Sequence, residues 1–293
     1  MNEYIIINSW TKANSHWSGL PGITMKVEPS QPIGVFDSGI GGLTVVRALM
    51  QRLPHENIVY FGDTARVPYG PKSAQTVREY AAQDTDFLVS KNVKLIVVAC
   101  NTVSSVALDV VQKRARVPVI GVIEPGARGA ALATTKKRVG VIGTTGTILS
   151  KAHSHSLRQI DPSISVFAQP CPLFVPLIEE GWLNHKATEL IAKEYLFPLS
   201  LEKIDTLILG CTHYPLLRET ISKVFHNSVT LIDPGEETAK EAERVLDKLH
   251  LRNPSTAQPN LQFFVSDIPH KFTEIGERFL GHKLSRVQKV PLP

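Results

Sequence analysis

Two cysteines in this sequence lie in closely similar local settings. Cys100 ends an apolar run and is followed by Asn101-Thr102, and Cys211 ends another apolar run and is followed by Thr212-His213. A thiol between a buried strand and the start of a helix lies where backbone N–H groups and the helix dipole favour anions. Either cysteine alone is most simply a buried, inert thiol. Two of them in equivalent settings instead predict a pair of thiols that act as acid and base.

Two opposed thiols suit the racemisation of an amino acid without a cofactor. One base removes the α-proton from one face of the carbon while a conjugate acid delivers a proton to the other face. An ordinary thiol, with a pKa of about 8.5, is only a few per cent thiolate at neutral pH. Each thiol therefore needs help from a helix N-terminus or from a neighbour, and His213 and Asp37 are the candidates. The alternatives are a structural or exposed His213 and an Asp37 that caps the turn before Gly39.

The other short motifs indicate no further chemistry. Cys171 lies between two prolines and has no counterpart in the other half of the chain, so we expect a structural thiol. Gly39-Ile-Gly41 resembles the start of a dinucleotide fingerprint, but Thr44 stands where its third glycine belongs. The cysteines and His213 lack the spacing of a zinc site, so no metal is expected. Three widely spaced cysteines favour reduced thiols in a cytoplasm over a disulfide framework.

The candidate residues follow strands of an expected α/β fold. Short runs rich in valine and isoleucine alternate with helical patterns, which is typical of a parallel sheet covered on both faces. Ligands bind such sheets at the carboxyl ends of the strands, where both thiols, Asp37 and the loop 63–70 are expected. The predicted strands are Ile33–Phe36, Ile58–Gly62, Leu95–Cys100, Val119–Ile123, Val139–Gly143, Ser165–Ala168, Thr206–Cys211, Val229–Ile232 and Leu261–Val265.

Three helices are predicted in more detail. One follows Gly42 and stops at Pro54, another begins at the N-cap Ser73, and a third covers Pro269–Leu280 after the polar linker 252–260. The expected inward residues are Leu43, Val46, Met50 and Leu53 in the first helix and Val77, Tyr80, Ala81 and Leu88 in the second.

The two halves of the chain resemble each other. IGVFDSG from Ile33 is similar to VGVIGTT from Val139, and LIVVACNT from Leu95 is similar to LILGCTH from Leu207. The order is the same in both halves, which indicates an approximate duplication of one α/β domain. We expect a tail over 1–31, a first domain over 32–124, a second domain over 125–233, and a C-terminal segment over 234–285 that returns to the first domain. If the halves face each other, the two thiols flank one cleft.

The composition is that of a globular protein. Of 293 residues, 43% are hydrophobic and 20% are charged, which is enough apolar material for two cores. The net charge of +5 is spread along the chain, so no nucleic-acid partner is expected. The tail lacks the apolar stretch of a signal peptide or a membrane span, and Met25 is an alternative start. A cytoplasmic location without a membrane partner is therefore expected.

Four motifs together resemble the glutamate racemases of the aspartate/glutamate racemase superfamily. They are VFDSGIGGLT from Val35, YFGD and VPYG between Tyr60 and Gly70, ACNT from Ala99, and GCTHYP from Gly210. The resemblance implies two pseudo-symmetric flavodoxin-like parallel-sheet domains with the active site between them. It also implies cofactor-independent interconversion of L- and D-glutamate for peptidoglycan, hence for cell wall biogenesis and cell shape.

The resemblance further implies roles for single residues. Cys100 would handle the proton of D-glutamate and Cys211 that of L-glutamate, with Asp37, Glu179 and His213 assisting. Glu179 could equally be a solvated helix end. The expected partners are glutamate and, as an option, a second copy of the chain. The implied substrate-binding residues are Asp37, Ser38, Tyr69, Gly70, Asn101, Thr102, Thr144, Thr147, Thr212 and His213.

Three other functions stay open from the sequence. A related racemase could act on another acidic amino acid such as aspartate, or on a hydantoin. A thiol hydrolase could use Cys211 and His213, and Cys100 would then be dispensable. A protein of the same fold could also bind acidic ligands without turning them over.

Overall fold

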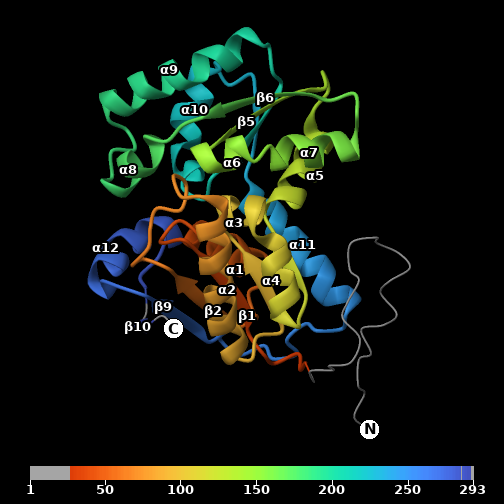
Figure 1. Ribbon diagram of the computed structural model, residues 1–293, viewed down its shortest axis with the longest axis vertical. Helices are drawn as coiled ribbons and strands as arrows, with labels where there is room; N and C mark the ends of the chain where they lie inside the picture. Colours follow the sequence, from red (N-terminus) through yellow and green to blue (C-terminus); the bar gives the residue numbers. More distant parts are fainter. Residues whose placement is uncertain (1–26, 285, 292–293) are drawn as a thin grey trace.

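The computed structural model describes residues 27–284 and 286–291, so most of the predicted tail, Met25 included, lies outside the described residues. The described chain forms two sheets, of strand order β10-β9-β2-β1-β3-β4 and β6-β5-β7-β8. Each pair of neighbouring strands in both sheets is parallel. We call the first sheet with its helices the first lobe and the second sheet with its helices the second lobe (Figure 1). The predicted fold class, two parallel-sheet α/β domains, is confirmed.

Most strands begin within a residue of their predicted starts, but several end earlier. Cys100 and Cys211 were predicted inside strands, whereas Cys100 is the N-cap of a helix and Cys211 lies in the turn after its strand. The strands are β1 (Ile33–Asp37), β2 (Ile58–Gly62), β3 (Leu95–Val98), β4 (Val119–Gly121), β5 (Arg138–Gly143), β6 (Ser165–Pro170), β7 (Thr206–Gly210), β8 (Thr230–Ile232), β9 (Leu261–Val265) and β10 (Val287–Lys289).

Helices cover both sheets. The predicted N-cap Ser73 is confirmed, since its hydroxyl accepts a hydrogen bond from the N–H of Thr76 at 3.2 Å. The helices are α1 (Leu43–Arg52), α2 (Ala74–Ser90), α3 (Asn101–Val106), α4 (Leu108–Ala115), α5 (Ile123–Ala133), α6 (Thr145–Leu149), α7 (Ala152–Ile160), α8 (Phe174–Glu179), α9 (Lys186–Leu201), the 3₁₀ helix η2 (Tyr214–Leu217), α10 (Arg218–Val224), α11 (Pro234–Lys248) and α12 (Pro269–Leu280).

The single apolar stripe predicted for α1 is too narrow. Val45 and Leu49 are also buried, because α11 and α12 pack against α1 in addition to the sheet. Both helices follow the second lobe in the chain, so the sequence of α1 alone does not show that they cover it. The result is a helix buried on most of its circumference.

The chain crosses twice between the lobes, through α5 and through the start of α11. The two crossing helices pack closely (Figure 1), and a Cβ atom on Gly129 would lie 2.7 Å from the side chain of Glu237. After α11 the chain returns to the first sheet, where β9 pairs with β2. The lobes are therefore joined by two adjacent connections beside the thiol-bearing strand ends.

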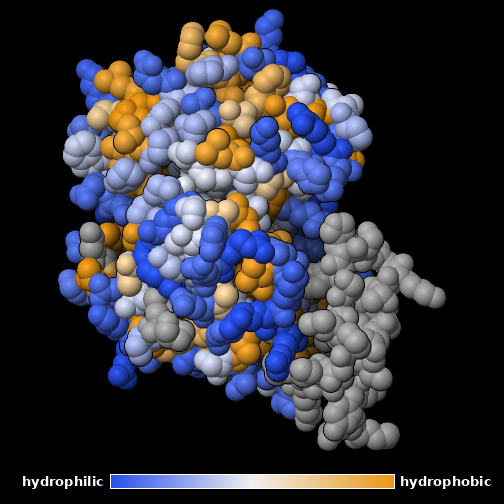
Figure 2. Space-filling model, viewed as in Figure 1, coloured by the Kyte–Doolittle hydropathy of each residue, from blue (hydrophilic) through white to orange (hydrophobic). Residues whose placement is uncertain are grey.

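The surface of the second lobe carries several exposed apolar side chains. Apolar groups gather at the upper left of Figure 2, over α9, where Leu190, Phe197 and Leu201 are more than half exposed. The opposite face of α9 is buried and includes Ala192 and Leu196. None of the helices within the described ranges is long and apolar enough to cross a membrane.

Candidate active site

A cavity between the lobes is lined by both thiols. Cys100 reaches it from the end of β3, and Cys211 reaches it from the end of β7. Each thiol is only 6% exposed. The other residues that line the cavity are Ser38, Val67, Pro68, Tyr69, Gly70, Asn101, Thr102, Thr144, Val175, Thr212 and His213.

Cys100 is buried and lies near the carboxylate of Asp37. Its Sγ lies 3.7 Å from the hydroxyl of Ser38, and burial together with the charge of Asp37 raises the pKa of the thiol to about 12. The Asp37 carboxylate accepts a hydrogen bond from the N–H of Gly39 at 3.0 Å. Burial also raises the pKa of Asp37, although the charge of His213 opposes that shift. At neutral pH Cys100 is accordingly a thiol that can donate a proton.

Cys211, His213 and Glu179 form a connected series of polar contacts. The Sγ of Cys211 lies 3.8 Å from Nδ1 of His213, and Nε2 of His213 lies 3.1 Å from the carboxylate of Glu179. Burial opposes a charged imidazole, but the hydrogen bonds to Cys211 and Glu179 outweigh it and raise the pKa of His213 to about 10. The ring of Phe279 packs edge-on against the imidazole, with centroids 5.0 Å apart. An imidazolium here can exchange a proton with Cys211 and stabilise negative charge on the sulfur.

Hydroxyl and backbone groups join the lobes at one end of the cavity. The hydroxyl of Thr102, on the first lobe, lies 3.0 Å from that of Thr144 and 3.3 Å from that of Thr147, both on the second lobe. The N–H of Gly146 donates to the carbonyl of Gly70 at 3.0 Å. This end of the cavity therefore offers neutral donors, which suit a carboxylate.

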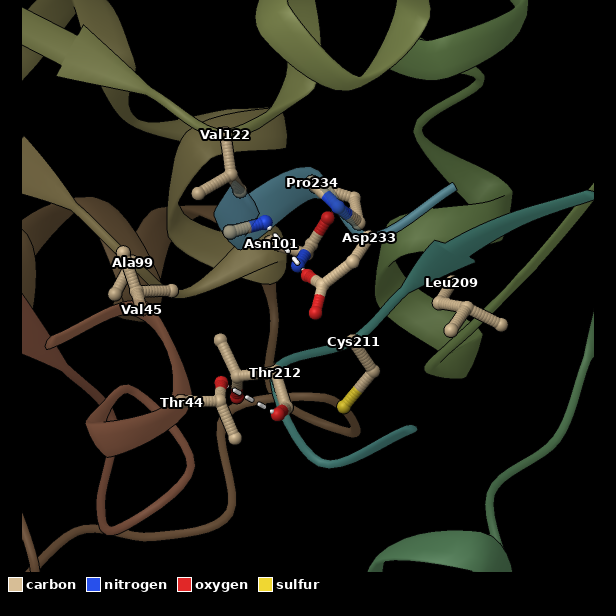
Figure 3. Close-up of a pocket in the computed structure, with 11 residues that line it drawn as sticks. Thr44, Val45, Ala99, Asn101, Val122, Leu209, Cys211, Thr212, Asp233 and Pro234 are labelled. Carbon is tan, nitrogen blue, oxygen red and sulfur yellow. Dashed lines mark hydrogen bonds between the residues drawn. The ribbon is translucent and has the colours of Figure 1, made fainter. Parts of the chain in front are cut away.

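A second set of contacts joins the lobes behind Cys211. In Figure 3 the hydroxyl of Thr44 points to Thr212, whose carbonyl accepts its hydrogen bond at 2.9 Å. Asn101 lies above these residues in the same view, and its side-chain oxygen is 3.2 Å from Nε2 of His153, on α7 of the second lobe. Burial lowers the pKa of His153 to about 4, so this histidine is neutral. It donates to the oxygen of Asn101 and leaves the amide N–H₂ of Asn101 for the cavity.

Tyr69 lines the cavity, but its hydroxyl is bound to carboxylates outside the cavity. That hydroxyl contacts the buried carboxylates of Asp63 and Asp84, the latter at 3.1 Å. Arg66 donates to the same two carboxylates, at 2.6 and 3.1 Å. Burial and the charge of Asp63 raise the pKa of Asp84 well above its ordinary value. The network holds the loop that ends at Gly70 against the cavity.

The structure brings together most of the residues predicted for the site. Three of them lie just outside the cavity wall: Asp37 is near Cys100, Thr147 contacts Thr144, and Glu179 contacts His213. Cys171 is buried and does not line the cavity, and its Sγ lies 3.7 Å from the carbonyl of Gln169. Within the described ranges, no three His, Cys, Asp or Glu side chains are placed to hold a metal ion. Four further residues were not predicted from the sequence, because they reach the site through contacts distant in the chain: Val175, His153, Arg278 and Phe279.

The chain is similar to known proteins along most of its length. A family model described as Asp/Glu/Hydantoin racemase matches residues 42–242. A glutamate racemase of Syntrophus aciditrophicus is 52% identical over 261 residues, which cover 89% of this chain and 97% of that protein. The crystal structure of glutamate racemase from Francisella tularensis in complex with D-glutamate has a TM-score of 0.84 and 46% identity, over 89% of this chain and 98% of that one. A Bacillus anthracis glutamate racemase has a TM-score of 0.88 and 41% identity, over 91% and 99%.

More distant structures share the fold alone. An aspartate racemase homologue from Pyrococcus horikoshii has a TM-score of 0.51 and 18% identity, over 74% of this chain and 99% of that one. The likeness to glutamate racemases is thus much greater in both sequence and structure.

Proposed function

The chain belongs to the Asp/Glu/Hydantoin racemase family, and from that premise we propose that it interconverts L- and D-glutamate with two thiols: one of Cys100 and Cys211 removes the α-proton, and the other donates its own proton to the opposite face. The observation that carries this assignment of residues is that both thiols line one cavity from opposite lobes. Aspartate is not favoured as the substrate, because the relatives of about half identical sequence are glutamate racemases.

The reaction needs one proton on each side of the α-carbon. From L-glutamate, the Cys211 thiolate takes the α-proton and becomes a thiol, and the C–H electron pair stays on the carbon as a carbanion. The Cys100 thiol then donates its proton to the opposite face and becomes a thiolate, which gives D-glutamate. The return reaction reverses each step, so no electron acceptor or cofactor is required.

The charges around the thiols support this direction for the free protein. The raised pKa of Cys100 keeps its proton in place, while the imidazolium of His213 lies beside Cys211. Cys100 is thus placed to donate a proton, and Cys211 lies beside a cation that stabilises negative charge on its sulfur. This arrangement fits the reaction from L-glutamate, whereas the reaction from D-glutamate needs the opposite assignment of acid and base.

Neutral donors bind the substrate in this proposal. The hydroxyls of Thr102, Thr144 and Thr212, the amide of Asn101 and the backbone around Ser38 and Gly70 face or border the cavity. Neutral donors hold a carboxylate without a nearby lysine or arginine that would bind the thiolate too. The ammonium group of the substrate can then stabilise the developing carbanion.

The wider role follows from the activity. We propose that the D-glutamate supplies peptidoglycan synthesis in the cytoplasm, and hence cell wall biogenesis and cell shape. We also propose a homodimer, for which the exposed apolar side chains of α9 are the supporting feature. Light scattering on the purified protein measures the oligomeric state directly.

Proton NMR in heavy water tests the function and the two thiols together. The unaltered protein should place deuterium at the α-carbon of both enantiomers and form each from the other. Cys211→Ala should abolish racemisation and allow exchange of D-glutamate only, and Cys100→Ala should allow exchange of L-glutamate only. Cys171→Ala is the matched control and should stay active.

The outcomes separate this proposal from its rivals. Near-normal racemisation in either of the first two variants would exclude that thiol as a required base. A thiol hydrolase would keep its activity in Cys100→Ala, and a mere binder would show glutamate binding without exchange. Activity that disappears on dialysis and returns with pyridoxal phosphate would refute the cofactor-independent reaction.

A further inference from the structure

Helix α12 belongs to the first lobe, but it contacts His213 and the end of α8, which lie beside Cys211 on the second lobe. It packs on α1 of the first lobe so closely that a Cβ atom on Gly276 would lie 2.8 Å from the side chain of Leu43. Phe279 of α12 is fully buried, and its ring packs edge-on against the imidazole of His213. The imidazole that serves Cys211 therefore rests on a side chain of the opposite lobe.

Arg278, the residue before Phe279, contacts the backbone of Glu179, whose carboxylate lies beside His213. Nη1 of Arg278 donates to the carbonyls of Ile178 and Glu179, at 3.1 and 3.3 Å. These are the last two carbonyls of α8, and that of Ile178 also accepts a hydrogen bond from the N–H of Gly181 at 3.0 Å. A cation at a helix C-terminus is favourable, whereas the carboxylate of Glu179 at the same end is not.

The chain around this contact leaves room for the guanidinium group. Gly181 has a φ of +79°, and a Cβ atom there would lie within 3.0 to 3.1 Å of three atoms of Arg278. A side chain at this position would therefore displace the arginine. The turn after α8 and the arginine of α12 fit each other across the boundary between the lobes.

We propose that Arg278 is a positioning residue for the reaction: it holds the last turn of α8 so that Glu179 stays on His213 and His213 stays beside Cys211. Because Arg278 is on the first lobe and α8 is on the second, this support exists only when the lobes are together. The inference rests on the proposed two-thiol mechanism, since it assigns Arg278 a role through His213 and Cys211.

The proposal predicts a change in the titration of His213. Three charged or titratable groups face this imidazole: Cys211 and Glu179 through the contacts above, and Asp37 across the cavity. If α8 loosens, Glu179 leaves and its stabilisation of the imidazolium is lost. The pKa of His213 should then fall from about 10 towards its ordinary value of 6.5, while a role for Arg278 in packing alone would leave the titration unchanged.

The kinetic prediction is equally specific. The two enantiomers have equal free energies, so kcat/KM must fall by the same factor in both directions. Loss of a charge-assisted contact of this kind corresponds to about a ten-fold decrease. The basic limb of the pH profile of kcat/KM should move to lower pH together with the titration of His213.

The experiment compares Arg278→Ala, Arg278→Lys and Glu274→Ala in the full chain. Glu274 is an exposed residue one turn earlier on α12, and its replacement controls for changes to the helix. Racemisation is measured in both directions across pH, and NMR follows the imidazole of His213. We expect about a ten-fold loss and a lower His213 pKa in Arg278→Ala, partial rescue by lysine, and no change in Glu274→Ala. If the alanine variant does not fold, Arg278→Gln provides the same comparison, because it retains a donor without the charge.

Two results would overturn the inference. One is an Arg278→Ala protein with the kinetics and His213 titration of the Glu274→Ala control. The other is a loss of activity with an unchanged His213 titration. If the unaltered protein fails to racemise glutamate, the proposed function is wrong, while the NMR titration still reports whether Arg278 supports the imidazolium.

Discussion

At the scale of single residues, the two thiols differ in the charge that lies beside them. Cys100 lies near the carboxylate of Asp37, while Cys211 lies near the imidazolium of His213. In the proposed reaction each thiol is the base for one enantiomer, so the site has to work with either thiol as the acid. On that proposal, the unequal surroundings of the free protein correspond to one of two states between which the site alternates.

Replacing Asp37 with asparagine should make Cys100 more acidic. The negative charge is removed while burial stays, so the pKa of Cys100 should fall below its value of about 12. Ultraviolet absorbance of the thiolate can follow the titration in a Cys171→Ala, Cys211→Ala background, where one thiol remains. Ser38→Ala is the control, because it removes a neighbour that favours the thiolate and should not lower the pKa. An unchanged or higher pKa in Asp37→Asn would contradict the assignment.

His153 should make the protein sensitive to acid. Its folded-state pKa of about 4 lies below its ordinary value of 6.5, so the unfolded chain binds the proton better. The stability that the neutral ring contributes is complete above pH 6.5 and is lost as the pH falls towards 4, by up to about 3 kcal/mol. Urea unfolding of His153→Phe should show a weaker pH dependence over this range. His155→Phe, at an exposed position of the same helix, should behave like the unaltered protein, and equal slopes for all three would rule out this effect.

The two thiols could be predicted from the sequence because each comes at the end of an apolar run, in one of two similar stretches of the chain. His153 and Arg278 could not be predicted, because their partners are 52 and 100 residues away in the chain. Neither lies in a motif, and a histidine or an arginine on a helix surface is ordinary. Their roles depend on how the lobes face each other, which local spacing does not determine.

At the scale of the elements, the loops that follow β1 and β7 approach so closely at Gly41 that only a glycine fits there. A Cβ atom on Gly41 would lie 2.2 Å from the hydroxyl of Thr212 and 2.5 Å from Nδ1 of His213. The loop after β1 is therefore shaped by the loop after β7, on the other lobe. The backbone of one lobe determines where the imidazole of the other lobe can lie.

Gly41→Ala should consequently impair the reaction more than the fold. The added methyl group must displace Thr212 and His213, and a misplacement of this size in a catalytic group costs about a hundred-fold in rate. Gly39→Ala is the matched control, since its Cβ atom would meet only Val67, at 3.1 Å and beyond. Steady-state kinetics and thermal unfolding of both variants separate the two effects. Similar kcat/KM values for the two variants would show that Gly41 does not lie so close to Thr212 and His213 in solution.

The elements themselves were predicted well where burial alone determines them. The strands Ile58–Gly62 and Leu261–Val265 and the helix Pro269–Leu280 have the predicted bounds. The predicted strand Val119–Ile123 is too long, because Ile123 already begins α5. An apolar run that continues from a strand into a buried helix has no change of composition at the junction, so the sequence pattern does not show where one ends.

At the scale of the whole molecule, a buried ion pair ties together distant parts of the first lobe. Nζ of Lys94 lies 2.5 Å from the carboxylate of Glu56, with side chains 0% and 3% exposed. The same ammonium group donates to the carbonyls of Pro29 and Leu251. Lys94 immediately precedes β3, at the opposite end of the strand from Cys100. The ion pair thus links the segment before β1, the base of the sheet and the chain that returns from α11, far from the reacting atoms.

Lys94→Met should destabilise the protein strongly without changing the chemistry. Removing one partner leaves the carboxylate of Glu56 buried without a counter-charge, which costs about 3–5 kcal/mol. Adding Glu56→Gln removes that charge and keeps an acceptor for the N–H of Asn253, which Glu56 accepts at 2.9 Å. The double variant should therefore be more stable than Lys94→Met alone, as measured by urea unfolding of all four proteins in the cycle. Folded samples of each should racemise glutamate with similar kcat, because the ion pair lies at the opposite end of β3 from Cys100 and the cavity. A double variant less stable than Lys94→Met would mean that the carboxylate is solvated or otherwise balanced, and that its charge is not what makes the lysine necessary.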